Sequence, residues 1–208
     1  QWPLICGVLG LALAGIEIVR STAGIMGVAV SDLARDDLAW YLFDTPAGRA
    51  GLTRAFLLVL LLAVLGWQSQ RAERPFPIRR VTLLAGVALV SLAWNGHAAS
   101  GEGVSGTVRL VAGMAHLLAA GGWIGAIFAL LILFVRHGKP AAGEGLHMLW
   151  RALHTFSRPG TVFVGVLVVT GILHYGDLVG WSIAPLFHSR HGNLMLLKLA
   201  LFAAMLGL

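Results

Sequence analysis

Long apolar stretches recur along the chain, and short segments between them hold most of the charged residues. A helix needs about 20 apolar residues to cross roughly 30 Å of hydrocarbon, because each residue adds about 1.5 Å. Residues 56–67 and 162–173 are apolar on every face, unlike the alternating strands of a barrel. We therefore predict an all-α, polytopic transmembrane helix bundle of six spans, at Leu4–Val30, Leu52–Trp67, Val81–Ala98, Val108–Val135, Thr161–Tyr175 and Asn193–Leu208.

No soluble domain is expected between the spans, so residues 1–208 are predicted to form a single transmembrane domain. The fifth span can gain a turn from Phe156 onward, which places Pro159 in its first turn, where a missing N–H costs little. The chain opens on Gln1 and stops within an apolar run at Leu208. We therefore expect a longer parent protein, with a cleaved signal peptide as the competing explanation of the start.

Lys and Arg are concentrated in the segments between the second and third spans and between the fourth and fifth spans. Because cationic loops stay on the cytoplasmic side of a membrane, these two loops are predicted to lie inside. The loop after the first span is acidic, and the loops around Glu102 and Asp177 carry little positive charge, so these three are predicted to lie outside. The sides alternate along all six spans, which supports the segmentation.

Composition and motifs exclude several classes of function. The chain is 58% hydrophobic and 12% charged, with a mean hydropathy of +0.84 and a formal net charge of +6. The topology explains this charge, and no basic patch or motif indicates a nucleic-acid partner. The single cysteine, Cys6, excludes an intramolecular disulfide and a CxxC motif. The sequence contains no GxSxG, HExxH or Walker-type motif, so no motif of a hydrolase, a metalloprotease or a nucleotide-binding enzyme is found.

Three histidines are predicted to share one depth in the membrane. Counting from the charged residues that mark the surfaces places His97 and His174 about one turn below the outer surface and His116 about two turns below it. The third and fourth spans are joined by a short loop, so they are expected to be antiparallel neighbours, and His97 can then face His116. Ionisable groups in hydrocarbon are costly and usually functional. We predict a metal site formed by His97, His116 and His174.

Each of these histidines has a structural alternative, in which a neutral ring is hydrogen-bonded to a neighbouring helix. Met114 is two residues from His116, about 200° around the helix, and is predicted to pack rather than to bind the same ion. His188 and His191 form either a second small outer site or a solvated pair. The inner-side histidines, interpreted as interfacial residues, are His137, His147 and His154.

Three charged residues in the spans also require an explanation. Glu17 and Arg20 are three residues apart in the first span and are predicted to pair, with an ion path along this span as the functional alternative. Arg54 is expected to snorkel toward lipid headgroups rather than to meet Asp44. Close helix packing is predicted around the glycines of the fourth span, Gly121, Gly122 and Gly125.

Two segments resemble the central signature of the CopD copper-resistance family of bacterial inner-membrane proteins. These are Gly96-His97-Ala98-Ala99 and the stretch HLLAAGGWIG from His116 to Gly125. Other segments that are similar to the family are residues 44–49 with Arg54, residues 156–158 and residues 192–198. The resemblance covers nearly the whole chain, and it is most specific in the two histidine segments.

The resemblance implies a multi-helix protein that lies in the lipid bilayer of the bacterial inner membrane and transports copper ion. It also implies that the protein typically receives the copper from a small periplasmic copper-binding partner, CopC. It makes His97 and His116 the inherited candidate ligands. His191 departs from the family, in which an aromatic residue is expected there. Family members usually have another helix before Trp2 and more chain after Leu208.

Two alternative functions stay open at this point. The CopD group is distantly similar to membrane haem proteins of the HemJ type, which would make the chain an oxidoreductase that binds haem b. Facing histidines at one depth suit haem as well as copper. A copper-binding membrane subunit without transport is the other alternative.

Overall fold

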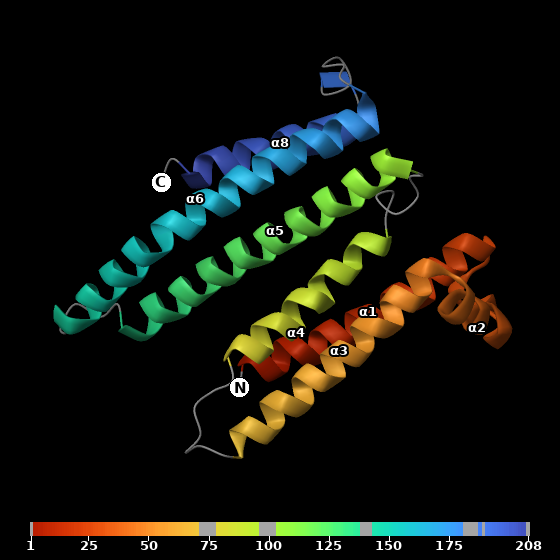
Figure 1. Ribbon diagram of the computed structural model, residues 1–208, viewed down its shortest axis with the longest axis horizontal. Coiled ribbons are helices and arrows are strands. Elements are labelled where there is room, and N and C mark those ends of the chain that lie inside the picture. The colour runs from red at the N-terminus through yellow and green to blue at the C-terminus, as the bar shows by residue number, and fades with distance from the viewer. Residues whose placement is uncertain are drawn as a thin grey trace.

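The computed structural model describes residues 2–70, 78–95, 103–137, 143–180, 187, 188 and 190–206. These ranges contain helices and no strand, which confirms the all-α prediction (Figure 1). The elements are α1 (Trp2–Met26), the 3-10 helix η1 (Val30–Asp32), α2 (Arg35–Asp44), α3 (Pro46–Ser69), α4 (Ile78–Val90), the 3-10 helix η2 (Ser91–Asn95), α5 (Gly103–His137), α6 (Gly143–Val179) and α8 (Arg190–Leu206).

Helices occupy all six predicted span positions. Four of them, α1, α3, α5 and α6, are long and apolar enough to cross a membrane. The third position is filled by α4 continued by η2, which together rise about 30 Å because a 3-10 helix rises about 2.0 Å per residue. The last position is filled by α8, whose apolar part is shorter. The protein is therefore a helical membrane protein.

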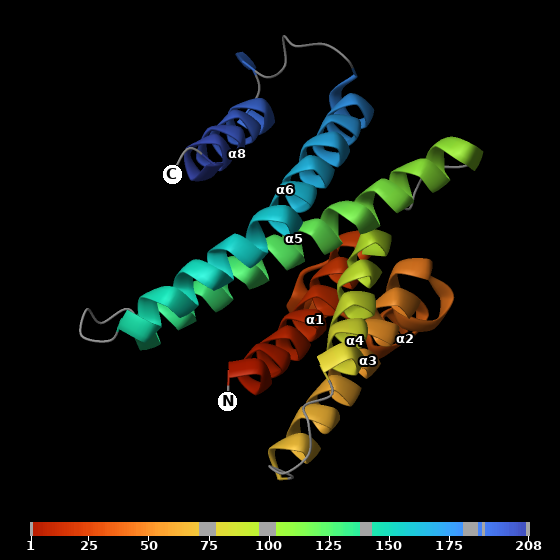
Figure 2. The ribbon, with the colours of Figure 1, turned by 60° about the vertical axis from the view of Figure 1, so that its left-hand side comes forward.

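The prediction that Pro159 lies in a first turn is wrong. The fifth predicted span is the core of α6, which begins at Gly143 and contains Pro159 in its interior. Proline removes one backbone hydrogen bond and crowds the preceding turn, so an interior proline bends a helix rather than always ending it. Figure 2 shows that α6 changes direction along its length. The residues before Pro159 continue the helix toward the predicted inner side.

The loop after the first span contains a helix that was not predicted, and α3 begins earlier than expected. Thr45 caps α3, since its hydroxyl oxygen accepts a hydrogen bond from the Gly48 N–H at 2.9 Å and its hydroxyl donates to the Tyr41 carbonyl at 2.6 Å. Pro46 occupies the first turn of α3, where a proline is favoured. Gly48 is required at this corner, because a Cβ there would collide with the Tyr41 backbone.

The helices form two neighbouring groups. In the first, α3 packs against α1, α2, α4 and η2; in the second, α5 packs against α6, and α5 also contacts α4 and η2 (Figures 1 and 2). The expected antiparallel contact between the third and fourth spans is thus confirmed for α4 and α5. This arrangement leaves most apolar side chains of α5 and α6 exposed, as lipid-facing surfaces require.

The glycine run of α5 fits two neighbours at once. A Cβ at Gly121 would lie 2.5 Å from Leu89 Cδ2 on α4, and one at Gly122 would lie 2.7 Å from Phe163 Cζ on α6. Close packing is confirmed at these two positions. It is not found at Gly125, where a Cβ would meet no atom within 4 Å.

Candidate metal site between α5 and α6

Polar side chains from α5 and α6 meet in the half of their interface that is predicted to be the outer one. On α5, Arg109 and His116 are seven residues apart, and this spacing returns to almost the same helix face. On α6, Thr170, His174 and Asp177 follow one another at spacings of four and three, which also keeps them on one face. The antiparallel packing of the two helices brings these two faces together.

His116 is held by a hydrogen bond across the interface. Its Nδ1 lies 2.8 Å from Oγ1 of Thr170, a buried residue of α6. The Thr170 hydroxyl donates its own proton to the Val166 carbonyl at 2.5 Å, so its oxygen is left to accept a bond from His116. We therefore assign the ring proton to Nδ1, which leaves the lone pair of Nε2 available to a metal ion.

His174 completes a pair of imidazoles. The ring centroids of His116 and His174 are 5.7 Å apart, and the rings are edge to face at 80°. Both side chains are partly buried. Two of the three predicted ligands therefore lie together although they come from different helices, and their role as metal ligands stays a prediction.

The third predicted ligand, His97, lies outside the described residues, so its place beside His116 stays a prediction. Among the residues that the structure does describe, no group of three or more His, Cys, Asp or Glu is arranged to hold a metal. His188 is exposed, and the side chain of His191 lies outside the description. Met114 is partly buried on α5.

An ion pair lies on the predicted outer side of the two histidines, and the sequence analysis did not predict it. Nε of Arg109 is 3.1 Å from Oδ1 of Asp177, and each side chain is about one third exposed, at 35% and 36%. Asp177 is one turn from His174, and Arg109 is two turns from His116. The seven-residue spacing of Arg109 and His116 places both on one face of α5, and this spacing could have indicated from the sequence that Arg109 lies in the same interface.

Aromatic rings lie in the α5–α6 interface on the predicted inner side of the histidines. Trp123 and Phe156 have ring centroids 5.5 Å apart, and Phe163 lies 6.5 Å from Phe156. Phe163 also packs against Gly122, where no larger residue would fit without a shift. The α5–α6 interface therefore changes from charged, to imidazole, to aromatic along the helices.

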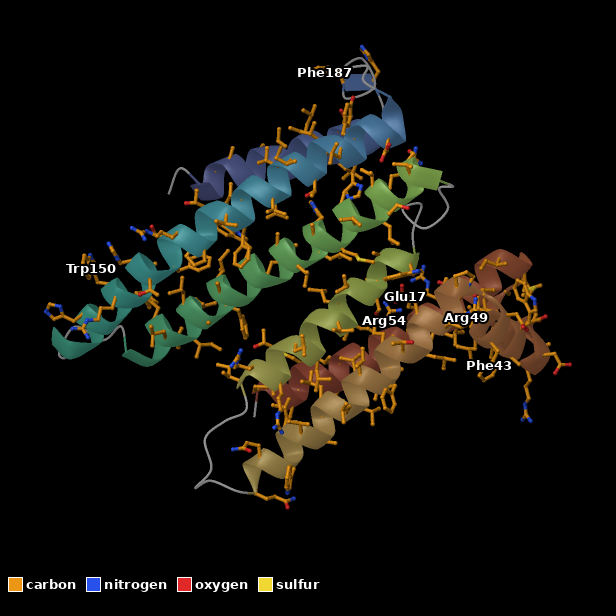
Figure 3. The ribbon with its side chains drawn as sticks, viewed as in Figure 1. Glu17, Phe43, Arg49, Arg54, Trp150 and Phe187 are labelled. Carbon is orange, nitrogen blue, oxygen red and sulfur yellow. The ribbon has the colours of Figure 1, made fainter. Side chains whose placement is uncertain are left out.

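Two expectations about the first and second spans are wrong. Arg54 does not snorkel, because it is only 4% exposed and its Nη2 lies 3.2 Å from Oε2 of Glu17 on α1 (Figure 3). Glu17 was predicted to pair with Arg20, but the ion pair found for it is with Arg54, and Arg20 is exposed. The neighbouring helix α1 supplies the carboxylate that pairs with this guanidinium.

The α5–α6 interface offers two imidazole side chains as nitrogen donors. Two neutral imidazoles suit copper, zinc, nickel or haem iron, while calcium and magnesium prefer oxygen ligands. A threonine that fixes the tautomer of one ligand is a typical outer-shell feature. The described residues therefore fit a transition-metal ion held by imidazole.

Family comparisons agree with the sequence resemblance. Residues 1–107 match the N-terminal domain of copper resistance protein D-like proteins, and residues 150–208 match the copper resistance protein D family. No solved structure matches the chain.

Three curated proteins are similar over almost the whole chain. Copper resistance protein D of Pseudomonas syringae pv. tomato is 32% identical over 96% of this chain and 64% of its own length. Copper transport protein CutJ of Bacillus subtilis (strain 168) is 31% identical, over 95% of this chain and 36% of its own length. Inner membrane protein YebZ of Escherichia coli (strain K12) is 26% identical, over 98% of this chain and 64% of its own length. The chain thus spans less than two thirds of each relative.

Proposed function

The chain belongs to the copper resistance protein D family, and from this membership and the paired histidines we propose that it transports copper across the bacterial inner membrane. Copper is the cargo in this proposal, and the chain acts as a multi-pass transporter rather than as an enzyme. Related proteins that carry the words copper resistance and copper transport in their names support the choice of metal.

The observation that carries the proposal is the arrangement of His116 beside His174. The hydrogen bond from His116 to Thr170 leaves Nε2 unprotonated, and the second imidazole is 5.7 Å away between centroids. Two neutral nitrogen donors from two helices can hold one copper ion without burying a net negative charge in the bilayer. We propose that His97, from the segment between η2 and α5, supplies a third nitrogen.

The direction of entry follows from the loop charges. The basic loops are assigned to the cytoplasm and the histidines to the outer half of the membrane. Copper would then reach the histidine pair from the periplasm, where a small copper-binding protein of the CopC type could deliver it. Passage inward would require Phe163 and its aromatic neighbours to move, because they lie in the interface below the histidines.

The experiment compares copper uptake into cells by His116→Ala, His174→Ala and His97→Ala variants with uptake by the parent protein at equal membrane abundance. We expect each variant to lose most of the uptake that the parent adds. His147→Ala is the matched control, because His147 is an exposed histidine of α6 far from the pair. Unchanged uptake in both His116→Ala and His174→Ala would refute the site.

Metal analysis of the purified protein separates the alternatives. About one copper per chain, lost in His116→Ala, supports the proposal. Copper binding without flux into sealed vesicles would instead indicate a non-transporting copper-binding subunit. Iron with a Soret absorption band would indicate haem b. The direct contact of His116 with Thr170 across the interface favours a bare ion, because a porphyrin there would have to separate α5 from α6.

A further inference from the structure

The ion pair between Arg109 and Asp177 occupies the outer entrance to the histidine pair. Asp177 is three residues from His174 on α6, so the two side chains project from the same face about 4.5 Å apart along the helix axis. Arg109 is on the same face of α5 as His116, about 10.5 Å farther out. A cation that approaches the histidines between these helices from the outer side meets this pair first.

The ion pair is held loosely. Both side chains are about one third exposed, although Nε of Arg109 is itself buried; this nitrogen lies 3.1 Å from the carboxylate and has no hydrogen-bond partner among the described residues. Charge attraction without a directed hydrogen bond, at a partly solvated site, contributes little to stability. Asp177 can therefore exchange Arg109 for another cation at small cost.

We propose that Asp177 is a reserve ligand for divalent copper. Arg109 holds it until the ion arrives, and the Asp177 side chain then moves to bind the ion together with His174 and His116, which are not arranged as a three-ligand site with it before the ion binds. This inference rests on the proposed function and adds an oxygen donor to that site. Two imidazoles and a carboxylate form a nitrogen and oxygen set, which suits Cu(II), whereas Cu(I) is favoured by thiolate and thioether sulfur. Arg109 then has a second role, because its charge opposes cations that cannot displace it.

The test measures Cu(II) and Cu(I) affinities of the purified full chain in detergent, by competition with chelators specific for each oxidation state. Asp177→Asn is expected to weaken Cu(II) binding at least about 10-fold, since loss of even an outer-shell partner typically costs about 10- to 100-fold. It should leave Cu(I) binding within a factor of about 2, because carboxylate is a poor ligand for that ion. Arg109→Gln is expected to tighten Cu(II) binding about 2- to 5-fold, because the ion then no longer has to break an ion pair. This factor corresponds to the small free energy of a partly exposed ion pair.

Direct ligation is separated from simple electrostatics by infrared difference spectroscopy. Addition of Cu(II) to protein labelled with 13C-aspartate should shift a carboxylate band that is missing in Asp177→Asn. Asp36→Asn is the control, since Asp36 is an exposed aspartate of α2. The double variant Asp177→Asn/Arg109→Gln removes both charges, and it should still bind Cu(II) more weakly than Arg109→Gln alone.

Each outcome bears on one claim. If copper binds and His116→Ala abolishes that binding, but Asp177→Asn changes neither the Cu(II) affinity nor the infrared band, the reserve-ligand role is refuted and the proposed function stands. Equal losses of Cu(I) and Cu(II) affinity in Asp177→Asn would also refute it, because they indicate a structural role. If the parent protein binds copper in neither oxidation state, both the inference and the proposed function fail.

Discussion

Replacement of Glu17 by glutamine should destabilise the protein more than any change to an exposed charge, because it leaves Arg54 buried without a counter-charge. Arg54 is 4% exposed, and neither its Nε nor its Nη1 has a hydrogen-bond partner among the described residues. At 3.2 Å and an effective dielectric constant of about 20, the attraction to Glu17 is about 5 kcal/mol. Part of this is offset by the desolvation of Arg54 in the folded protein.

The expected cost of Glu17→Gln is about 3 kcal/mol, at the low end of the range for a broken buried pair, because the Glu17 side chain is 35% exposed and partly screened. Arg54→Met should cost less, about 1 kcal/mol, since the carboxylate left behind can be hydrated while a methionine suits the buried site. The double variant Glu17→Gln/Arg54→Met should recover about 2 kcal/mol relative to Glu17→Gln alone.

The assay is reversible unfolding of the purified protein in mixed detergent micelles, with the free energy of unfolding taken from titration with a denaturing detergent. Arg49→Met is the matched control, because Arg49 is an exposed arginine of the same helix, and its cost should stay within about 0.5 kcal/mol (Figure 3). The reasoning fails if Arg54→Met costs more than Glu17→Gln, or if Glu17→Gln behaves like the control.

Three further predictions concern α5 and α6. Thr170→Val should lower copper affinity about 10-fold or more by removing the acceptor that fixes the His116 tautomer, as measured by chelator competition, whereas Thr161→Val, at an exposed site of α6, should not. Gly122→Ala should destabilise the protein by about 1–3 kcal/mol in detergent unfolding, because its methyl would meet Phe163, and an equal effect of Gly125→Ala would contradict this. Copper bound at equilibrium should fall as the pH is lowered from 7 toward about 6, since protons compete for imidazole nitrogen; constant occupancy over this interval would argue against histidine ligands.

The length of the apolar stretches was sufficient to predict a helix at each of the six span positions, but the helix ends depended on local chemistry. Thr45-Pro46 is a cap followed by a proline in the first turn, a start signal that extends α3 before the apolar run begins. The helix α2 is short and mixes charged with apolar residues, so hydropathy alone could not reveal it. Pro159 was misread because a proline preceded by helix-forming residues bends α6 instead of starting it.

Depth along a helix could be counted from the sequence, whereas the pairing of helix faces could not. Counting placed His116 and His174 at nearly one level, and the two rings do meet. The partners Thr170 and Asp177 depend on how α5 and α6 are rotated about their axes, which the residue count does not specify. The same holds for Arg54. From the sequence, an arginine near a span end is interpreted as a snorkelling residue, because the sequence does not specify that α1 packs beside it and supplies Glu17.

The two ion pairs of this protein have the same chemistry and opposite expected roles, and burial is the reason. Arg54 is surrounded by helices, so a separated guanidinium would have no water to replace Glu17, and exchange would carry the full desolvation cost. Arg109 and Asp177 are each about one third exposed, so water reaches both side chains and can hydrate the part of each that is exposed when the pair separates. A pair of the first kind fixes α1 against α3. A pair of the second kind suits an entrance, where a carboxylate must be kept in place in the absence of copper and released in its presence. A cation added from outside should therefore perturb the α5–α6 pair and leave the α1–α3 pair unchanged.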